Sequence, residues 1–105
     1  MRRGEIRLYR FTRPDKQRPV VILTRDSAIG VLGEVTVAPI TSTIRDIPTE
    51  VVLDESNGMP RRCAANLDHV QTVPKVRIGR LLATLDDVTM REVARALAFA
   101  LDMSA

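Results

Sequence analysis

The sequence predicts a mainly β fold that ends in one helix. Short runs rich in Val, Ile and Thr recur from residue 5 to residue 83, and Gly, Pro and polar residues separate them. After residue 86 the apolar residues recur instead at the three- and four-residue spacing of a helix. Many short strands followed by one helix are typical of a small barrel or a curled sheet with the helix packed on it.

The first half of the chain contains three strand candidates. Residues 5–11 alternate between apolar and polar side chains and include β-formers, which indicates a half-buried strand. Residues 18–24 are an apolar run typical of a strand buried on both faces. Residues 34–40 form the third candidate. Pro39 within it predicts a bulge or a strand end, so we expect the chain to leave the sheet near Thr41.

The second half contains shorter strand candidates and the helix. The strands are expected at residues 49–53, 63–67, 69–73 and 78–83, with a tight turn at Asn57-Gly58. The helix follows, and the apolar positions expected on one face of it are Met90, Val93, Ala94, Leu97 and Leu101. Thr84 and Asp87 precede it and fit a capping box, with Asp87 in the place of the usual Glu.

Length and composition limit the classes of function. A chain of 105 residues without repeats or linkers is expected to form one domain over residues 1–105. One Cys excludes an internal disulfide, and one Cys with one His falls short of a four-ligand zinc site. The acidic residues are scattered or stand at the helix start, so neither a metal nor another cofactor is expected. The apolar runs are too short to span a bilayer, and we expect a soluble cytoplasmic protein without membrane contact.

Charge is distributed unevenly along the chain, although the net charge is only +3. Residues 1–30 carry eight basic and three acidic side chains, and residues 61–85 carry five basic and one acidic. The segments after each of these two basic blocks are net acidic. Folded onto one face, the basic blocks would favour a phosphate-rich partner. Four separately solvated surfaces fit the same distribution, so charge alone leaves both interpretations open.

Two features suggest a site for an anionic group. Arg18 stands between a polar loop and a buried strand, which would hold its guanidinium on a rigid base. Thr41, Ser42 and Thr43 place three hydroxyls where the chain leaves the sheet. A guanidinium and a hydroxyl can both donate to a phosphate, which would support RNA cleavage by the substrate's own 2′-OH. Taken by themselves, these residues favour the ordinary interpretation of a strand-end cation and a turn.

Other catalytic arrangements receive less support. Asp68 and His69 would suit a Ser–His–Asp triad, but neighbouring residues of a strand point to opposite faces and would not bond one another. The chain has neither a nucleophile-elbow motif nor a phosphate-binding glycine loop. A lone histidine is most often a surface or hydrogen-bonded residue, which is the first expectation for His69.

Four segments match the motifs of one family in the right order and with compatible spacing. They are R-G-E-I at residues 3–6, R-P-V-V-I-L at 18–23, V-A-P-I-T-S at 37–42, and D-H-V-Q-T-V at 68–73 followed by I-G-R-L at 78–81. Each fragment is short, but their combination is specific. The chain resembles the MazF family of toxin endoribonucleases, which includes PemK-like toxins of type II toxin–antitoxin modules.

The resemblance implies an SH3-like curled barrel with a C-terminal helix, the fold of MazF-like and CcdB-like toxins, assembled as a homodimer. It also implies metal-independent, sequence-specific cleavage of single-stranded RNA (messenger, transfer or ribosomal) that leaves 2′,3′-cyclic phosphate and 5′-hydroxyl ends and inhibits translation and growth. By position, Arg18 and Thr41 match the catalytic arginine and threonine of the family. The residues expected to contact RNA are Arg13, Lys16, Gln17, Ser42, Thr43, Asp68, His69 and Gln71. The implied partner is a MazE-like antitoxin whose acidic segment lies over the RNA groove.

The sequence departs from the family pattern at two positions and in the loop at residues 12–17, which is shorter than in many relatives. Arg7 stands where the family usually has Trp after R-G-E-I, and His69 replaces the common Gln. With an aromatic content of 3%, base stacking would rely on Tyr9, Phe11 or arginine planes. The alternatives are a CcdB-like toxin that binds DNA gyrase without cutting RNA and an inactive barrel that only binds nucleic acid. The gyrase-binding family uses a C-terminal Trp, which this chain lacks.

Overall fold

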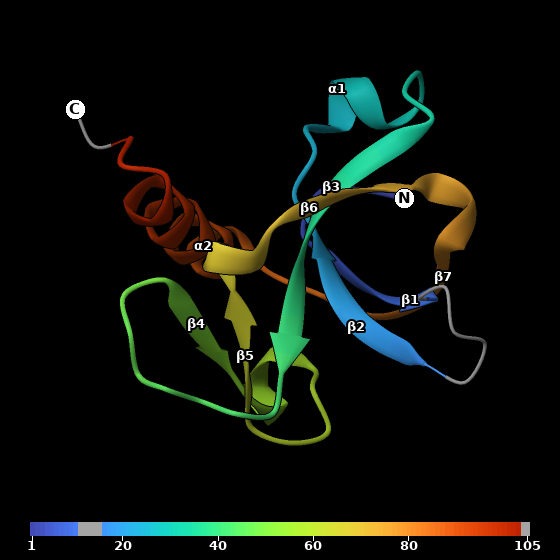
Figure 1. The fold of residues 1–105 in the computed structure, drawn as a ribbon. Coiled ribbons are helices and arrows are strands. Elements are labelled where there is room, and N and C mark those ends of the chain that lie inside the picture. The colour runs from blue at the N-terminus through green and yellow to red at the C-terminus, as the bar shows by residue number, and fades with distance from the viewer. Residues whose placement is uncertain (11–15, 104–105) are drawn as a thin grey trace.

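The fold is a curled antiparallel sheet with a helix packed against it (Figure 1). A computed structural model describes residues 1–10 and 16–103. The strands are β1 (Glu5–Arg10), β2 (Gln17–Ile22), β3 (Glu34–Thr41), β4 (Glu50–Leu53), β5 (Cys63–Asn66), β6 (Gln71–Pro74) and β7 (Ile78–Thr84). The helices are α1 (Asp26–Ile29) and α2 (Asp87–Ala100), and short 3₁₀ turns form η1 (Glu55–Asn57), η2 (Leu67–His69) and η3 (Lys75–Arg77).

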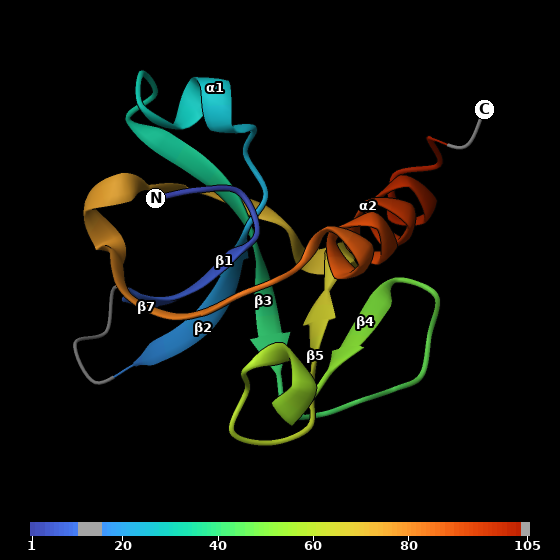
Figure 2. The ribbon, with the colours of Figure 1, turned by 180° about the vertical axis from the view of Figure 1, so that it is seen from behind.

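The sheet divides at β3, its longest strand. The strands follow the order β4-β5-β3-β2-β1-β7, and β6 pairs with β3 outside this path. Along one edge β3 pairs first with β6 and then with β5, and along the other it pairs with β2. Figures 1 and 2 show β4 and β5 turned away from β1, β2 and β7, with α2 on the side of β4 and β5. The predicted mainly β fold with a C-terminal helix is confirmed, as a curled sheet that does not close within the described residues.

Pro39 lies inside β3 and causes no bulge in its pairing with β2. It pairs with Val20 in an unbroken register. Along the opposite edge it falls between the residues that pair with β6 and those that pair with β5, where the ladder is interrupted and a residue without an N–H is tolerated. β3 ends at Thr41, as the sequence predicts.

Two apolar cores lie on opposite faces of the sheet. The core under α2 contains Ile6, Val21, Leu53, Met90, Val93 and Ala96, among others. The core on the other face contains Tyr9, Val20, Ile22, Ile29, Val35, Val37 and Val73. Because Val21 belongs to one core and its neighbours Val20 and Ile22 belong to the other, β2 is buried on both faces, as predicted. Arg18 therefore extends from a strand that is fixed from both sides.

The start and the buried face of α2 differ from the prediction. Thr84 is the last residue of β7, so the expected capping box does not form. Asp86 caps the helix instead, because its Oδ1 accepts the N–H of Thr89 at 2.8 Å, and this bond holds the pKa of Asp86 below its ordinary value. Of the positions expected on the buried face, Ala94 and Leu101 are exposed, and Ala96 is buried instead.

Three other local features also bear on the predictions. The four-residue α1 went unpredicted because its N-cap, Arg25, makes no side-chain hydrogen bond and so leaves no capping signal. His69 ends η2 and does not begin a strand, so β6 starts later than expected, at Gln71. The turn at Asn57-Gly58 is confirmed, since Gly58 has a φ of 88°, which favours glycine. Among the described residues, no helix combines the length and the apolarity needed to cross a bilayer.

Candidate active site

Arg18 and Thr41 lie on neighbouring strands and line the same pockets. In the pairing of β2 with β3, Val20 lies opposite Pro39. This is the last pair of the β2–β3 ladder, and Arg18 and Thr41 each lie two residues beyond it. The guanidinium and the hydroxyl are therefore brought together at this end of the two strands, although the residues are far apart in the sequence.

Two pockets meet at this pair of residues. The first, of about 300 Å³, is lined by Arg18, Thr41, Ser42, Met59, Pro60 and Arg61, among others. The second, of about 210 Å³, is lined by Arg18, Thr41, Thr43, Arg45, Asn66 and His69, among others. Arg18, Ile40 and Thr41 line both pockets, so they form the boundary between them. A ligand that reaches from one pocket into the other passes over Arg18 and Thr41.

The turn after β3 is held by the Thr41 side chain. The N–H of Thr43 donates to Oγ1 of Thr41 at 3.0 Å. Because Oγ1 is the acceptor in this bond, the hydroxyl hydrogen of Thr41 can still donate to a ligand. Thr41 is half-buried, whereas Arg18, Ser42 and Thr43 are exposed. The hydroxyl is thus fixed in place while the groups around it are open to solvent.

Both pockets are positively charged. Arg18 lines both of them, Arg61 lines the first and Arg45 lines the second. No acidic side chain of the described residues lines either pocket. Guanidinium groups bind phosphate and carboxylate through paired hydrogen bonds, so the site is suited to an anionic ligand.

The turn η2 brings His69 into the second pocket, whereas Asp68 forms hydrogen bonds outside it. The Oδ1 of Asn66 accepts the N–H of Asp68 at 2.9 Å, and Oδ2 of Asp68 accepts the hydroxyl of Thr49 at 2.6 Å. His69 lines the second pocket, whereas Asp68 lines neither of the two. The expectation that both residues lie on a strand is wrong, because they lie on a 3₁₀ turn. The hydrogen bond that the structure gives for the Asp68 carboxylate comes from the hydroxyl of Thr49 and not from the imidazole of His69.

Other residues expected to contact RNA lie outside these two pockets. Gln17 precedes Arg18 on β2 but lines a different pocket. Lys16 is exposed directly before β2, and Gln71 is exposed at the start of β6. Arg13 lies outside the described residues. Of the eight residues expected to contact RNA, the two pockets therefore bring Ser42, Thr43 and His69 next to Arg18 and Thr41.

Three charged or amide side chains of these pockets, Arg45, Arg61 and Asn66, were not singled out from the sequence. Arg45 is the single basic residue of the acidic segment 31–60, and Arg61 begins the second basic block, so both carried a charge signal. Asn66 carried no signal in the sequence. It reaches the second pocket because β5 is buried and the chain turns at η2, and both features depend on contacts between residues that are distant in the sequence.

Thiol and metal chemistry find little support at this site. Cys63 lines the first pocket, but burial raises the pKa of its thiol, and the negative charge of Asp54 raises it further. A thiol with a raised pKa stays protonated at neutral pH and is a poor nucleophile. In the part of the chain that the structure describes, no three His, Cys, Asp or Glu side chains are grouped so that they would hold a metal ion.

Comparison with known proteins identifies the family. The sequence model of the family described as "PemK-like, MazF-like toxin of type II toxin-antitoxin system" matches residues 2–101. The protein named "Probable endoribonuclease MazF5" of Mycobacterium tuberculosis is 46% identical over 89 residues, which cover 84% of this chain and 82% of that protein. "Endoribonuclease MazF3" of the same species is 40% identical over 89 residues, covering 85% of this chain and 86% of that protein.

Solved structures agree with the sequence matches. The Mycobacterium tuberculosis toxin MazF-mt6 superposes with a TM-score of 0.87 at 37% identity, covering 96% of this chain and 99% of the other. A mycobacterial endoribonuclease in complex with its cognate antitoxin superposes with a TM-score of 0.88 at 25% identity, covering 100% and 98%. The family match therefore extends over nearly the whole chain and is accompanied by the same fold. The chain belongs to the PemK-like, MazF-like toxin family of type II toxin–antitoxin systems.

Proposed function

We propose that this chain is an endoribonuclease and the toxin of a toxin–antitoxin pair, and that it cuts single-stranded RNA at the Arg18–Thr41 site. Its family is one of toxins, and its relatives at 46% and 40% identity are named endoribonucleases. The observation that supports this assignment of the site is that Arg18 and Thr41 both line each of two basic pockets. Membership in this family favours RNA cleavage over the CcdB-like gyrase-binding alternative.

The proposed reaction is a displacement at phosphorus within the RNA strand. The 2′-OH beside the scissile phosphate attacks phosphorus, so that the O2′–P bond forms while the P–O5′ bond breaks. The 2′-oxygen loses a proton and the departing 5′-oxygen gains one. The products are a 2′,3′-cyclic phosphate and a 5′-hydroxyl, and negative charge builds up on the non-bridging oxygens during the reaction.

Arg18 and Thr41 bind the scissile phosphate in this scheme. The guanidinium donates two hydrogen bonds to the non-bridging oxygens, and the Thr41 hydroxyl donates another. Both groups extend from strands, so they are in place before charge develops and stabilise it as it forms. A guanidinium stays protonated in proteins, so Arg18 acts by binding and by its charge and not as the base. Activation of the 2′-OH then depends largely on its alignment with the phosphorus.

The two pockets hold the nucleotides on either side of the scissile bond. Arg61 in the first pocket and Arg45 in the second bind backbone phosphates, while Ser42 and Thr43 donate to the backbone from the turn. His69 has a ring that stacks on a base and nitrogens that reach a base edge. A preference for particular bases then comes from the pocket that contains His69.

The same surface fits an acidic partner. We expect the acidic segment of a cognate MazE-like antitoxin to cover Arg18, Arg45 and Arg61 and so to exclude RNA, because peptide carboxylates compete for the same guanidinium groups. The toxin is expected to act as a homodimer in the cytoplasm and to inhibit translation by cutting messenger, transfer or ribosomal RNA. Light scattering at micromolar concentration tests the dimer, and a monomeric mass would contradict it.

Cleavage of RNA in the presence of EDTA tests the proposal. Purified protein is expected to cut a long single-stranded RNA in excess EDTA, and the fragments are expected to carry 5′-hydroxyl ends that polynucleotide kinase labels directly, together with 2′,3′-cyclic phosphates. Loss of cutting in EDTA with rescue by magnesium would contradict the metal-independent mechanism, and 5′-phosphate ends would contradict attack by the 2′-OH. Arg18→Ala protein purified in parallel controls for contaminating nucleases. Intact RNA together with tight binding of gyrase would support the CcdB-like alternative.

A further inference from the structure

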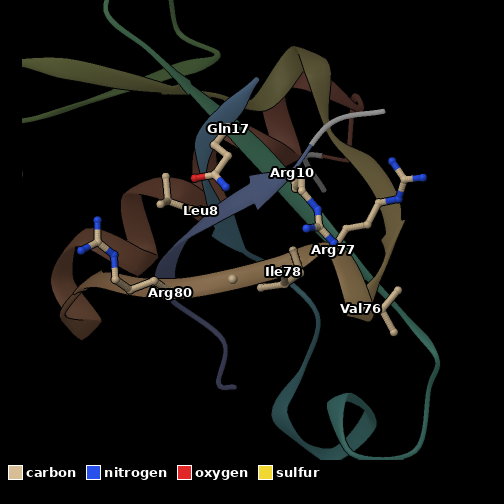
Figure 3. A pocket seen from close by; sticks show the side chains of 8 residues that line it. Leu8, Arg10, Gln17, Val76, Arg77, Ile78 and Arg80 are labelled. Carbon is tan, nitrogen blue, oxygen red and sulfur yellow. The ribbon is translucent and has the colours of Figure 1, made fainter. Parts of the chain in front are cut away.

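A third pocket lies at the end of the β1–β2 pair, on the side of the sheet opposite to Arg18. It has a volume of about 450 Å³, more than either pocket at the Arg18–Thr41 site. Its lining includes Leu8, Arg10, Gln17, Arg77, Ile78 and Arg80. Figure 3 shows Arg10 and Arg77 on one side of the pocket and Arg80 on the other, with Leu8 and Ile78 between them. Guanidinium groups from β1, η3 and β7 thus surround an apolar floor.

The three arginines have no acidic counterpart in the pocket. No Asp or Glu of the described residues lines it. The ion pair found among those residues joins Arg7 to Glu5, and none of the three pocket arginines takes part in it. Arg10 and Arg80 are exposed and Arg77 is half-buried, so a ligand from solvent can reach all three. Like charges gathered in one pocket repel one another, and a bound anion relieves that repulsion.

The remaining lining residues favour a nucleotide over a simple anion. Leu8 and Ile78 offer apolar surface at the floor, and Val76, which is 85% exposed, offers more at the rim. The amide of Gln17 both donates and accepts hydrogen bonds, as a base edge requires. Arginine planes stack on bases while their N–H groups bind the phosphate. A phosphate with a base attached would use all of these groups, whereas a bare carboxylate or phosphate would use only the charge.

The pocket is also adjacent to the proposed cleavage site. In the β1–β2 ladder, Tyr9 pairs with Arg18 and the next pair is Arg10 with Gln17. The two sites are therefore one residue pair apart along the same two strands. Because neighbouring residues of a strand point to opposite faces, Arg18 and Gln17 serve different sides of the sheet. An RNA strand that leaves Arg18 and passes this end of the strands would reach the arginine pocket next.

We propose that the pocket of Arg10, Arg77 and Arg80 binds a nucleotide of the single-stranded RNA substrate outside the scissile bond. This inference rests on the proposed function and extends its binding surface from one face of the sheet to the other. Binding there adds affinity and sets which stretch of RNA is presented, while the chemistry stays with Arg18 and Thr41.

Binding of an uncleavable RNA tests the inference independently of cleavage. The probe is a fluorescent, mixed-sequence 2′-O-methyl RNA of about 20 nucleotides, which keeps its phosphates but lacks the attacking hydroxyl, and its affinity is followed between about 50 and about 200 mM salt. Arg77→Ala and Arg80→Ala are each expected to weaken binding about fivefold or more and to reduce the salt slope by about 0.7 for each phosphate that the variant no longer neutralises. Arg91→Ala removes an exposed arginine of α2 outside this pocket and is the matched control. Circular dichroism checks that each variant is folded. If Arg77→Ala is unstable, the test rests on Arg80→Ala, which removes an exposed side chain.

The outcomes separate this inference from the proposed function. If Arg77→Ala and Arg80→Ala bind the RNA as the wild type does, or weaken no more than Arg91→Ala, the inference is overturned even though the protein cuts RNA. If pocket-dependent binding is found and natural RNA is not cut, the inference stands and the proposed function fails. A fluorescent poly-glutamate peptide is measured in parallel. Loss of peptide binding in the two variants with unchanged RNA binding would overturn the inference in favour of an acidic protein partner.

Discussion

Arg18 of β2 and Thr41 of β3 line the same two pockets, and each lies two residues beyond the pair formed by Val20 and Pro39. Val20, two residues from Arg18, and Ile40, next to Thr41, are buried and anchor the strand ends in the cores. The positions of the guanidinium and the hydroxyl are therefore set by strands that are packed into the cores. A site held in this way is preorganised, which is the condition for electrostatic stabilisation of a developing charge.

The hydroxyl of Thr41 is expected to contribute directly to the reaction rate. Thr41→Val keeps the shape of the side chain but removes the donor, and we expect the single-turnover rate to fall about a hundredfold, as when one oxyanion donor is lost. Thr41→Ser keeps the hydroxyl and is expected to retain most of the activity. Ser42→Ala, in the same turn, is expected to change the rate far less. Cleavage by Thr41→Val at the wild-type rate would exclude this hydroxyl from the site.

His69 is expected to affect which RNA sequences are cut. It is the single histidine of the chain and lines the pocket that also contains Arg18 and Thr41. Loss of one base interaction is worth about 1–3 kcal/mol, so His69→Ala is expected to lower kcat/KM at the preferred site about fivefold or more. Sequencing of the 5′-hydroxyl ends is expected to show a broader cleavage motif.

Arg91→Ala is the control for His69, because Arg91 is exposed on α2 and lines neither pocket at the site. It is expected to leave both the rate and the motif nearly unchanged. An unaltered motif in His69→Ala would show that this imidazole does not read a base.

The carboxylate of Glu5 is expected to stabilise the fold at neutral pH and to lose this effect in acid. Burial raises the pKa of Glu5, but hydrogen bonds from Arg7 Nε at 2.8 Å and from the N–H of Arg2 at 3.0 Å outweigh burial and bring the pKa below its ordinary value of 4.5. A carboxyl with a lowered pKa in the folded state stabilises the fold above its unfolded pKa, and this stabilisation is lost as the pH falls through the lowered value. Thermal unfolding between about pH 7 and about pH 3 measures the effect.

Glu5→Gln is the comparison for this titration. It removes the charge and retains an acceptor oxygen, so its melting temperature is expected to lie below that of the wild type at pH 7. The difference is expected to shrink as the pH falls below 4.5, because the wild-type carboxyl then becomes protonated too. A difference that stays constant across this range would show that the ion pair with Arg7 does not contribute to stability.

The parts of the fold that depend on local patterns could be predicted from the sequence. The double burial of β2, the end of β3 at Thr41 and the existence of α2 all follow from runs, alternation or helical spacing within single segments. The prediction failed where a neighbouring element decides the outcome. Thr84 has the chemistry of a helix cap, but its pairing with Glu5 keeps it in β7 and leaves the cap to Asp86.

The site could be predicted only in part for the same reason. Arg18 and Thr41 belong to recognisable motifs on strands, whereas Arg45, Arg61 and Asn66 come from a loop before β4, a loop before β5 and the end of β5. Pairing of β3 with β5 and the turn at η2 bring them to the pockets. The arginine pocket of Figure 3 likewise depends on the pairing of β1 with β7, which joins opposite ends of the chain.

The rate of RNA cleavage by Arg18→Ala tests whether this guanidinium takes part in the reaction. The variant is compared with the wild type and with Arg91→Ala on one oligonucleotide that carries a mapped cleavage site, after thermal unfolding has shown that all three proteins are folded. Arg18 is exposed at the end of β2, so its removal is expected to leave the fold intact. We expect Arg18→Ala to cut RNA at a rate at least about a hundredfold below that of the wild type, and Arg91→Ala to cut at an unchanged rate. Cleavage by folded Arg18→Ala at close to the wild-type rate would show that the reaction does not depend on Arg18.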